Sequence, residues 1–288
     1  MVQGLPFRNA IEDIQKMSKN TFTSPSLEKE SIESLSAKLL TTTAELSVAN
    51  KRLLQIQKER EEMLSNISHD LRAPITAIRS AVDYLLSDRD ISQGEYHSTL
   101  SLIDRRTANL EQLIQDMYEL FCVEDTNKPL SFETIDAGLF FETYFYDAII
   151  DSRYDNHEMI LDLPDSLQAS VSIDTQKLVR VLDNLFTNAA KYSEENTSIT
   201  LKVCLADPSH LQVSVIDQGF GIPADALEKV FTRTYTVASA RTPDSATGSG
   251  LGLSIAKAII ERHGGNIYCH STEGIGSTFT FTLPLKGE

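Results

Sequence analysis

The amino-acid sequence predicts an α+β protein of several parts, in which a helical hairpin precedes a two-layer α/β sandwich. Residues 63–86 and 96–121 carry apolar side chains three or four positions apart, which is the spacing of helices buried along one stripe. Residues 198–217 and 277–284 alternate apolar and polar side chains, as strands with one buried face do. Because two such helices expose too much apolar surface to stand alone, we expect two chains to pair their hairpins into a four-helix bundle, forming a homodimer.

The charge and composition of the chain exclude several classes of partner. Its 288 residues include 26 Lys and Arg and 41 Asp and Glu, a formal charge of −15, which opposes non-specific binding to nucleic acid or anionic lipid. The three cysteines, Cys122, Cys204 and Cys269, are far apart and form no metal-binding pair, as in reduced cytoplasmic proteins. No stretch reaches the roughly 18 to 20 apolar residues of a membrane span. We therefore expect a cytoplasmic chain with no nucleic-acid partner.

Residues 1–58 are predicted to form a helical segment upstream of the hairpin. A short apolar stripe after Pro6 is followed by a polar, proline-containing connector. Residues 32–56 then carry apolar side chains alternately three and four positions apart, which is a coiled-coil heptad. This order of helix, connector and helix resembles the HAMP relay modules that lie between a membrane helix and a signalling core. The resemblance implies a natural protein anchored in the cell membrane by a part absent here; a generic helical hairpin fits the same pattern.

The stretch SHDLRAP places His69 near the start of the first hairpin helix, on the face away from the predicted seam. An exposed imidazole is largely neutral at physiological pH and is then able to act as a nucleophile. Asp70 beside it could orient the ring or accept its proton. By themselves, an exposed histidine and its acidic neighbour are more often ordinary surface residues.

A second domain is predicted at residues 136–288, after a polar hinge at residues 123–135 that contains Pro129. Apolar periodicity predicts helices at residues 139–150, 175–192 and 253–265. It predicts strands at residues 158–163, 169–174, 198–205, 211–217 and 277–284. These elements together favour a mixed sheet with helices on one face.

Polar residues on one face of the predicted helix at 175–192 form the first candidate binding group. Asn184, Asn188 and either Lys191 or Tyr192 share this face. Their amide oxygens and ammonium group suit a magnesium triphosphate. Because asparagines inside a helix are poor helix formers, a functional role is more plausible than usual, although a solvated polar face is the alternative.

Two glycine-containing motifs form the other candidate groups. Asp217 ends a predicted buried strand, and Gly219 and Gly221 after it would allow the backbone to approach a planar ligand closely; taken alone, this is as often a plain turn. A second motif begins the last predicted helix, where free amides suit phosphate, and it contains Gly248, Gly250, Leu251 and Gly252. The polar residues 232–247 before it are expected to form a mobile lid, from which Arg233 and Arg241 could reach a γ-phosphate.

In this order, the histidine, asparagine, aspartate-glycine and glycine motifs resemble those of the sensor histidine kinases of two-component systems, over residues 59–285. The resemblance implies a HisKA-type dimerisation and phosphoacceptor hairpin at residues 59–122. It also implies a GHKL-type ATP-binding domain with a Bergerat-like fold at residues 136–288. Its implied activity is autophosphorylation of a histidine from Mg-ATP and transfer of the phosphoryl group to an aspartate in the receiver domain of a response regulator.

The same resemblance implies roles for individual residues. His69 would be the phosphorylated residue, with Asp70 as its catalytic neighbour. Asn188 would bind Mg²⁺, and Asp217 would contact adenine. The other residues implied to contact ATP are Asn184, Lys191, Tyr192, Gly219, Gly221, Arg233, Arg241, Gly248, Gly250, Leu251 and Gly252.

The sequence departs from the family pattern in two places. Ala73, which has no hydrogen-bonding side chain, stands where the family usually carries Thr or Asn to position water for dephosphorylating the regulator. Thr234 replaces an aromatic residue, and Thr236 a basic one, of the family's phenylalanine motif. Phosphatase activity and the docking of the lid are the functions these departures affect.

Two other functions fit parts of the pattern. ATP hydrolases of the gyrase, Hsp90 and MutL type place a water-activating glutamate four residues before the metal-binding asparagine, and here Asn184, which cannot act as a base, occupies that position. A degenerate dimeric scaffold would transmit conformation without catalysis. Intact His69, Asn188 and Asp217 argue against the scaffold.

Overall fold

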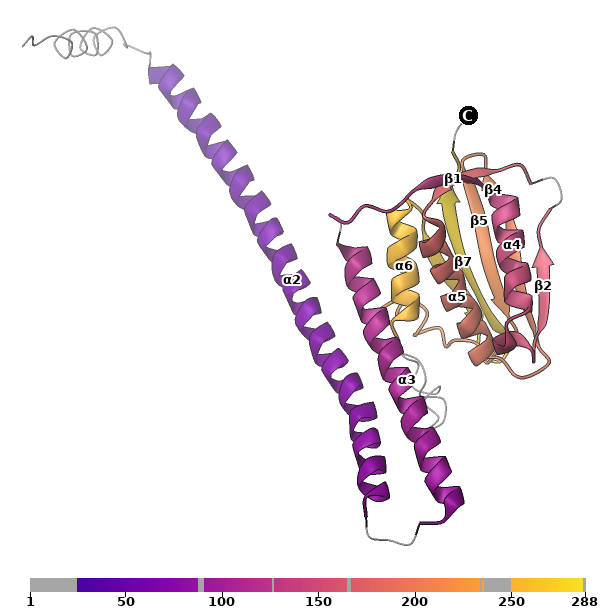
Figure 1. The fold of residues 1–288 in the computed structure, drawn as a ribbon. Coiled ribbons are helices and arrows are strands. Elements are labelled where there is room, and N and C mark those ends of the chain that lie inside the picture. Colours follow the sequence, from indigo (N-terminus) through magenta and orange to yellow (C-terminus); the bar gives the residue numbers. More distant parts are fainter. Residues whose placement is uncertain are drawn as a thin grey trace, which may run out of the picture. The chain divides into compact units, whose positions relative to one another are not determined.

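The computed structural model describes residues 25–87, 91–125, 127–164, 167–233, 235 and 250–286 (Figure 1). The chain divides into two compact units, residues 1–62 and 63–288, and each is described by itself. The short first helix predicted after Pro6, and the connector as far as residue 24, lie outside the described residues. The last two connector residues, Pro25 and Ser26, already belong to helix α2 (Pro25–Leu85).

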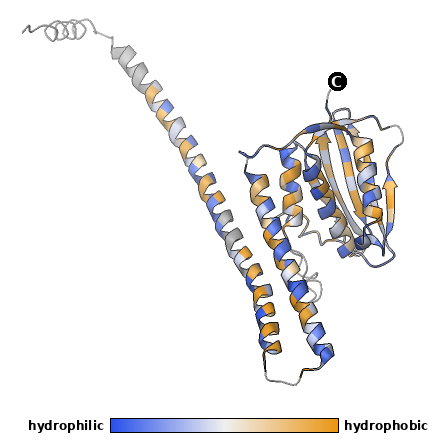
Figure 2. Ribbon diagram, in the orientation of Figure 1, coloured by the Kyte–Doolittle hydropathy of each residue, from blue (hydrophilic) through white to orange (hydrophobic). Residues whose placement is uncertain are grey.

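Helix α2 (Pro25–Leu85) is continuous through both stretches in which the sequence predicts a helix, residues 32–56 and 63–86. Figure 2 shows hydrophobic and hydrophilic residues interspersed along α2. In the first unit the predicted heptad side chains are exposed, as expected for a coiled-coil helix seen without a second strand; they include Leu35, Leu39, Leu46, Leu53 and Ile56. Among the described residues, no helix combines the length and the apolar character needed to cross a bilayer.

Helix α3 (Gln93–Glu124) confirms the second predicted helix and begins three residues earlier than expected. Its start is fixed by a capping box, in which the Ser92 hydroxyl accepts the Glu95 N–H at 3.3 Å and the Glu95 carboxylate accepts the Ser92 N–H at 3.0 Å. Near its other end, Leu113, Leu120 and Val123 are buried in the same hydrophobic core as the C-terminal domain.

The C-terminal domain contains a mixed five-stranded sheet of strand order β2-β4-β5-β7-β6, which confirms the predicted sheet type. Only β2 and β4 run parallel among these described neighbours; the other pairs are antiparallel. The strands are β2 (Glu158–Asp162), β4 (Ser198–Asp207), β5 (His210–Asp217), β6 (Ile267–Thr272) and β7 (Gly276–Pro284). A second, two-stranded sheet pairs β1 (Glu133–Asp136) with β3 (Ser170–Ile173).

Two strands were not expected from the sequence. Strand β6 follows the last helix, and β1 lies at the C-terminal end of the segment expected to be the hinge. The residues that connect α3 to the first strand of the C-terminal domain are therefore 125–132.

Three helices cover one face of the large sheet, which gives the two-layer sandwich predicted from the sequence (Figure 1). They are α4 (Ala137–Ile149), α5 (Thr175–Lys191) and α6 (Gly252–Arg262), and a short 3₁₀ helix, η1 (Ser152–Tyr154), follows α4. Fully buried side chains from both layers interlock; they include Phe141, Leu182, Leu185, Phe186, Ile259, Val213 and Phe281. Each such side chain contributes about 1.5–3 kcal/mol through burial.

Helix α5 supplies both core and cavity residues. Asp174 caps its first turn by accepting the Lys177 N–H at 3.2 Å. Its apolar stripe is buried against the sheet, and the opposite face carries Arg180, Asn184, Asn188 and Lys191 along an open cavity. This amphipathic pattern allows one helix to be anchored firmly while presenting a polar row.

Candidate functional site

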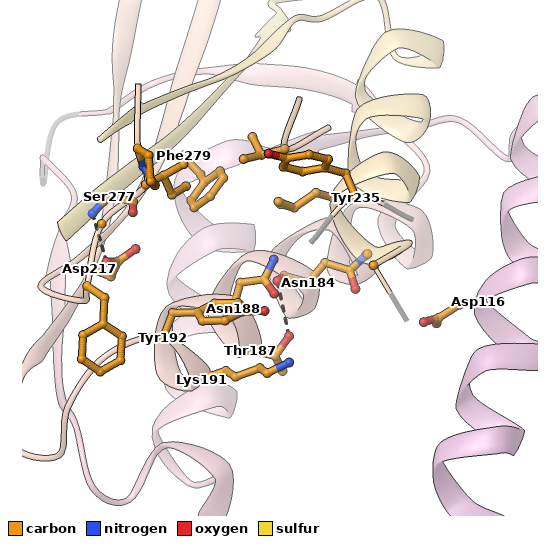
Figure 3. Close-up of a pocket in the computed structure, with 18 of the residues that line it drawn as sticks. Asp116, Asn184, Thr187, Asn188, Lys191, Tyr192, Asp217, Tyr235, Ser277 and Phe279 are labelled. Carbon is orange, nitrogen blue, oxygen red and sulfur yellow. Dashed lines mark hydrogen bonds between the residues drawn. The ribbon is translucent and has the colours of Figure 1, made fainter. Parts of the chain in front are cut away.

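A cavity of about 620 Å³ lies over the polar face of α5, a size typical of small-molecule sites. Its walls come from α5, the turn after β5, the start of β7 and the start of α6, with Gln112 and Asp116 of α3 at one side. In Figure 3, Asp217 and Ser277 lie on one side of the labelled α5 side chains and Asp116 lies on the other. The cavity therefore extends from the turn after β5 to the side of α3.

Asp217 forms the first end. Its carboxylate is buried, with 7% of the residue exposed, and its Oδ1 accepts the N–H groups of Gly219 at 2.9 Å and Ser277 at 3.0 Å. Burial raises the pKa of Asp217, and the two backbone N–H groups oppose that rise by stabilising the carboxylate. With Oδ1 fully occupied, Oδ2 is the acceptor that remains for a ligand in the cavity.

Gly219 and Gly221, near Asp217, lie so close to neighbouring backbone atoms that a side chain would not fit at either position. A Cβ on Gly219 would lie 2.2 Å from the carbonyl oxygen of Tyr192, and one on Gly221 would lie 2.1 Å from that of Thr272. Gly221 also has a left-handed backbone, with φ +68°. The close backbone approach predicted at these positions thus joins the turn to neighbouring segments, while Gly221 also lines the cavity.

The polar row of α5 lies between the two ends. Lys191 Nζ lies 5.0 Å from the Tyr192 ring centroid, a cation–π contact that positions the ammonium group. Asn184 is buried, and its Nδ2 has no hydrogen-bond partner among the described residues. A buried amide of this kind is costly unless a bound molecule satisfies it.

The start of α6 offers backbone N–H groups to the cavity. Its N-cap residue is Leu251, which has no side-chain acceptor, so the usual N-cap bond is missing from the described helix. Gly250, with φ +65°, turns the chain into the helix, and Gly250 and Gly252 line the cavity. A helix start of this type suits an anion.

These features fit a ligand with a flat polar group at one end and several negative charges at the other. The apolar side chains that line the cavity are Phe220, Ile222, Pro223, Val230, Leu253 and Phe279. The cations that line it are Arg153, Arg180 and Lys191. Among the described residues, no group of three His, Cys, Asp or Glu side chains forms a metal site, so a hard cation here would take amide and ligand oxygens.

Comparison with known families now identifies the two parts of the chain. Residues 59–126 match the His Kinase A (phospho-acceptor) domain, and residues 173–287 match the histidine kinase-, DNA gyrase B- and HSP90-like ATPase family. The chain belongs to the sensor histidine kinase family. The family resemblance stated from the sequence motifs is confirmed.

The chain is also similar in sequence to a known histidine kinase. The chain is 36% identical over 235 residues to sensor histidine kinase WalK of Bacillus subtilis, covering 81% of this chain and 38% of that protein. The chain therefore spans well under half the length of this relative.

Two solved structures share the fold. ThkA in complex with response regulator protein TrrA matches with TM-score 0.63 and 24% identity, covering 80% of this chain and 65% of that one. Full-length ShkA in complex with AMPPNP matches with TM-score 0.56 and 22% identity, covering 79% of this chain and 46% of that one.

Most of the nucleotide-site residues expected in a histidine kinase meet in the cavity. Those that line it are Asn184, Asn188, Lys191, Tyr192, Asp217, Gly221, Gly250 and Gly252. Gly219 binds Asp217 through its N–H, and Leu251 is buried at the start of α6. Arg233 forms an ion pair with Glu124 of α3 and does not line the cavity as described. Arg241 and Gly248 lie outside the described residues.

The expected phosphoacceptor motif lies within α2. The backbone of His69 is helical, whereas its side chain lies outside what the structure describes. Asp70 is half-buried, and Ala73 is exposed one turn further along the helix.

The sequence interpretation missed several residues of the kinase cavity. Ser277 and Phe279 belong to β7, which crosses the sheet beside β5, and no local pattern links them to Asp217. Asp116 reaches the cavity from α3. Arg180 had a usable signal, because it lies one helical turn before Asn184 on the same face.

Proposed function

We propose that the chain is an ATP-dependent histidine kinase that phosphorylates His69 and then passes the phosphoryl group to an aspartate of a response regulator. One observation carries the proposal: a single cavity places a buried carboxylate, Asp217, at one end and the polar row of α5 with the start of α6 toward the other. This arrangement suits adenine at the first end and the triphosphate at the second. The solved structures of ShkA with AMPPNP and of the histidine kinase ThkA with a response regulator support both partners.

Asp217 would recognise adenine through hydrogen bonding. Its Oδ2 accepts the exocyclic amino group, while the Gly219 and Ser277 N–H groups hold Oδ1 and fix the plane of the carboxylate. The apolar walls formed by Ile222 and Phe279 exclude water from the base. This pairing selects adenine by its donor group.

Asn184, Asn188 and Lys191 would hold the magnesium triphosphate. Asparagine side-chain oxygens are suitable Mg²⁺ ligands, and Asn188 is the residue we assign to the ion. Magnesium supplies neutralisation of charge on the phosphate oxygens. Lys191 and the first-turn N–H groups of α6 orient the phosphates, so most of the catalytic effect comes from positioning and charge.

His69 would receive the γ-phosphoryl group on a neutral ring nitrogen. The nitrogen lone pair attacks phosphorus as the bond to the β-bridging oxygen breaks, leaving ADP. Asp70, the next residue, accepts or stabilises the proton on the ring's other nitrogen. The product is a phosphohistidine from which a regulator aspartate takes the phosphoryl group.

A dimer is part of this proposal. Helix α3 carries exposed large apolar side chains along the region matched by the phosphoacceptor family, namely Tyr96, Leu100, Ile114, Tyr118 and Phe121. A second copy of the hairpin would bury this surface in a four-helix bundle. The membrane anchor implied by the HAMP-like resemblance would belong to parts of the natural protein outside this chain.

The described cavity argues against the hydrolase alternative. An ATP hydrolase of this superfamily needs a base near the metal site, and Asn184 at that place offers an amide without basicity. Release of inorganic phosphate at a rate far above phosphohistidine formation would favour the hydrolase instead.

A two-step transfer experiment tests the proposed function. The purified chain is incubated with Mg-ATP, freed of nucleotide, and mixed with a receiver domain or with the same domain lacking its acceptor aspartate. We expect phosphate to pass only to the intact receiver domain. Absence of transfer from a phosphorylated chain to any of a panel of receiver domains would contradict the second half of the proposal.

A further inference from the structure

Arg180 lies in the cavity while its guanidinium is bound to carboxylates of another helix. Its Nε donates to Glu119 Oε2 at 3.0 Å, and its Nη2 pairs with Asp116 Oδ1. Both acids belong to α3, whereas Arg180 belongs to α5. The cavity wall on this side is thus closed by an ion-pair cluster between two helices.

The cluster is well shielded from water. The side chain of Asp116 is 7% exposed and that of Arg180 is 26% exposed, so their attraction is screened less than that of a surface pair. Gln112 Nε2 donates to the same Asp116 oxygen at 2.8 Å. Lys177 binds Glu119 at 3.0 Å from outside the cavity.

The position of Arg180 suits a second role. It precedes Asn184 by one helical turn and Asn188 by two, on the cavity face of α5. In Figure 3, Asp116 lies on the side of the labelled residues opposite Asp217. A nucleotide whose base lies against Asp217 would therefore extend its phosphates toward this cluster.

We propose that Arg180 is a phosphate-binding residue of the nucleotide site, and that Asp116 and Glu119 of α3 compete with the nucleotide for its guanidinium. The inference rests on the proposed function and adds a residue that the sequence motifs did not identify. Arginine binds phosphate through a planar fork of N–H donors, which is the geometry it uses on carboxylates.

Electrostatic repulsion between bound phosphates and the α3 acids favours the release of Arg180 from those acids. A triphosphate beside Asp116 places like charges together at low exposure, which weakens the hold of α3 on Arg180. Asp116 retains the Gln112 amide when Arg180 turns away. By linkage, whatever strengthens the pairing of α3 with Arg180 weakens nucleotide binding by the same factor.

Binding measurements on the full chain test this competition between nucleotide and the α3 acids for Arg180. We would titrate Mg-AMPPNP and Mg-ADP into the wild-type chain and into Arg180→Gln, Arg180→Lys and Asp116→Asn. Losing a charged hydrogen-bond partner predicts about tenfold weaker AMPPNP binding in Arg180→Gln, a smaller loss for ADP, and partial recovery in Arg180→Lys. Asp116→Asn keeps the side-chain shape and should tighten AMPPNP binding about threefold or more.

A double variant and a matched control separate competition from simple loosening of α3. In the Arg180→Gln background, Asp116→Asn should give a clearly smaller gain, because the contested side chain is absent and only the direct repulsion between the Asp116 carboxylate and the phosphates is relieved. Lys177→Gln removes an ion pair to Glu119 from a residue outside the cavity and should leave AMPPNP affinity within about twofold. An equal gain in Lys177→Gln, or a gain from Asp116→Asn that is undiminished without Arg180, would overturn the inference.

The outcomes also distinguish a failure of this inference from a failure of the proposed function. A wild-type chain that binds AMPPNP, together with an Arg180→Gln chain of unchanged affinity and an unchanged circular dichroism spectrum, would overturn only the role of Arg180. A folded wild-type chain that binds no AMPPNP would overturn the proposed function and the inference together.

Discussion

Asp217 serves both the fold and the cavity through its two carboxylate oxygens. Oδ1 joins the turn after β5 to the start of β7 by accepting the Gly219 and Ser277 N–H groups. Oδ2 is left to a ligand. The same residue therefore positions the cavity wall and, in the proposed function, would bind the base.

Asp217→Asn separates these two roles. The asparagine oxygen can still accept both backbone N–H groups, which turns its NH₂ group toward the adenine amino group, so that two donors face each other. We predict at least about tenfold weaker ATP binding with little loss of stability. Affinities for ATP and GTP, measured together, should show a reduced preference for ATP because guanine presents a carbonyl oxygen at that position. Unchanged ATP affinity in a folded variant would rule out the assigned contact.

The sequence places Asp217 at the end of a buried strand, where the structure has it, but does not reveal the contacts that the glycines beside it make within the chain. An aspartate at the end of a buried strand followed by glycines is a local pattern, so position in the chain is sufficient to find it. The contacts of Gly219 with Tyr192 and of Gly221 with Thr272 join segments far apart in sequence. No local pattern contains that information, and the same is true of Ser277 and Arg180's acidic partners.

At the scale of elements, His263 connects the end of α6 to the start of α5. Its Nε2 accepts the Asp174 N–H at 3.0 Å, and its Nδ1 lies 2.7 Å from the Ile259 carbonyl oxygen. The ring is buried and packs edge-on against Phe132. This pattern requires the neutral ring with its proton on Nδ1.

The His263 contact predicts a loss of stability in mild acid. Burial lowers the pKa of His263 below its ordinary value of 6.5. Below about pH 6.5 the unfolded chain therefore binds a proton before the folded chain does, and the free energy of unfolding falls by up to about 1.4 kcal/mol per pH unit until the folded pKa is reached. Above about pH 6.5 the stabilisation from the neutral His263 ring is fully present.

Urea unfolding between pH 5 and pH 8 checks this prediction. His263→Gln can still accept the Asp174 N–H, and it should show a shallower pH dependence than the wild-type chain because one titrating group is gone. His157→Gln, which alters a less buried histidine, serves as the control. Identical slopes for His263→Gln and wild type would show that the buried ring does not control the acid response.

Most elements predicted from the sequence have strong periodicity, although the short strands β2 and β3 were predicted as well. Helices α3, α4, α5 and α6 and strands β4, β5 and β7 all have a clear buried stripe or face. Strand β1 has four residues of which three are exposed, and β6 alternates half-buried with exposed side chains. Such short or weakly buried strands are defined by their partners β3 and β7, which only the folded chain supplies.

At the scale of the whole molecule, one chain contains both the helix with the phosphoacceptor motif and the cavity proposed to bind nucleotide. The family matches cover both parts, residues 59–126 and 173–287. Helix α3 follows the acceptor motif in sequence and carries acids that bind Arg180 at the cavity. The fold class and the family were predictable from the sequence; this helix-to-cavity contact was not, because it depends on tertiary packing.

The proposed function requires the cavity to deliver the γ-phosphoryl group of Mg-ATP to His69. The most direct test is to incubate the full chain with γ-labelled ATP and Mg²⁺ and to measure the stability of the bound label in acid and in alkali. Parallel samples carry His69→Gln, the exposed control His97→Gln on α3, Asn188→Ala, and wild type with EDTA.

We predict that the label is lost in acid and kept in alkali, because the phosphorus–nitrogen bond of phosphohistidine is labile in acid and stable in alkali. Labelling should be present in wild type and His97→Gln, absent in His69→Gln, and reduced by at least about tenfold in Asn188→Ala and with EDTA. Acid-stable label, or label that persists in His69→Gln, would contradict the account.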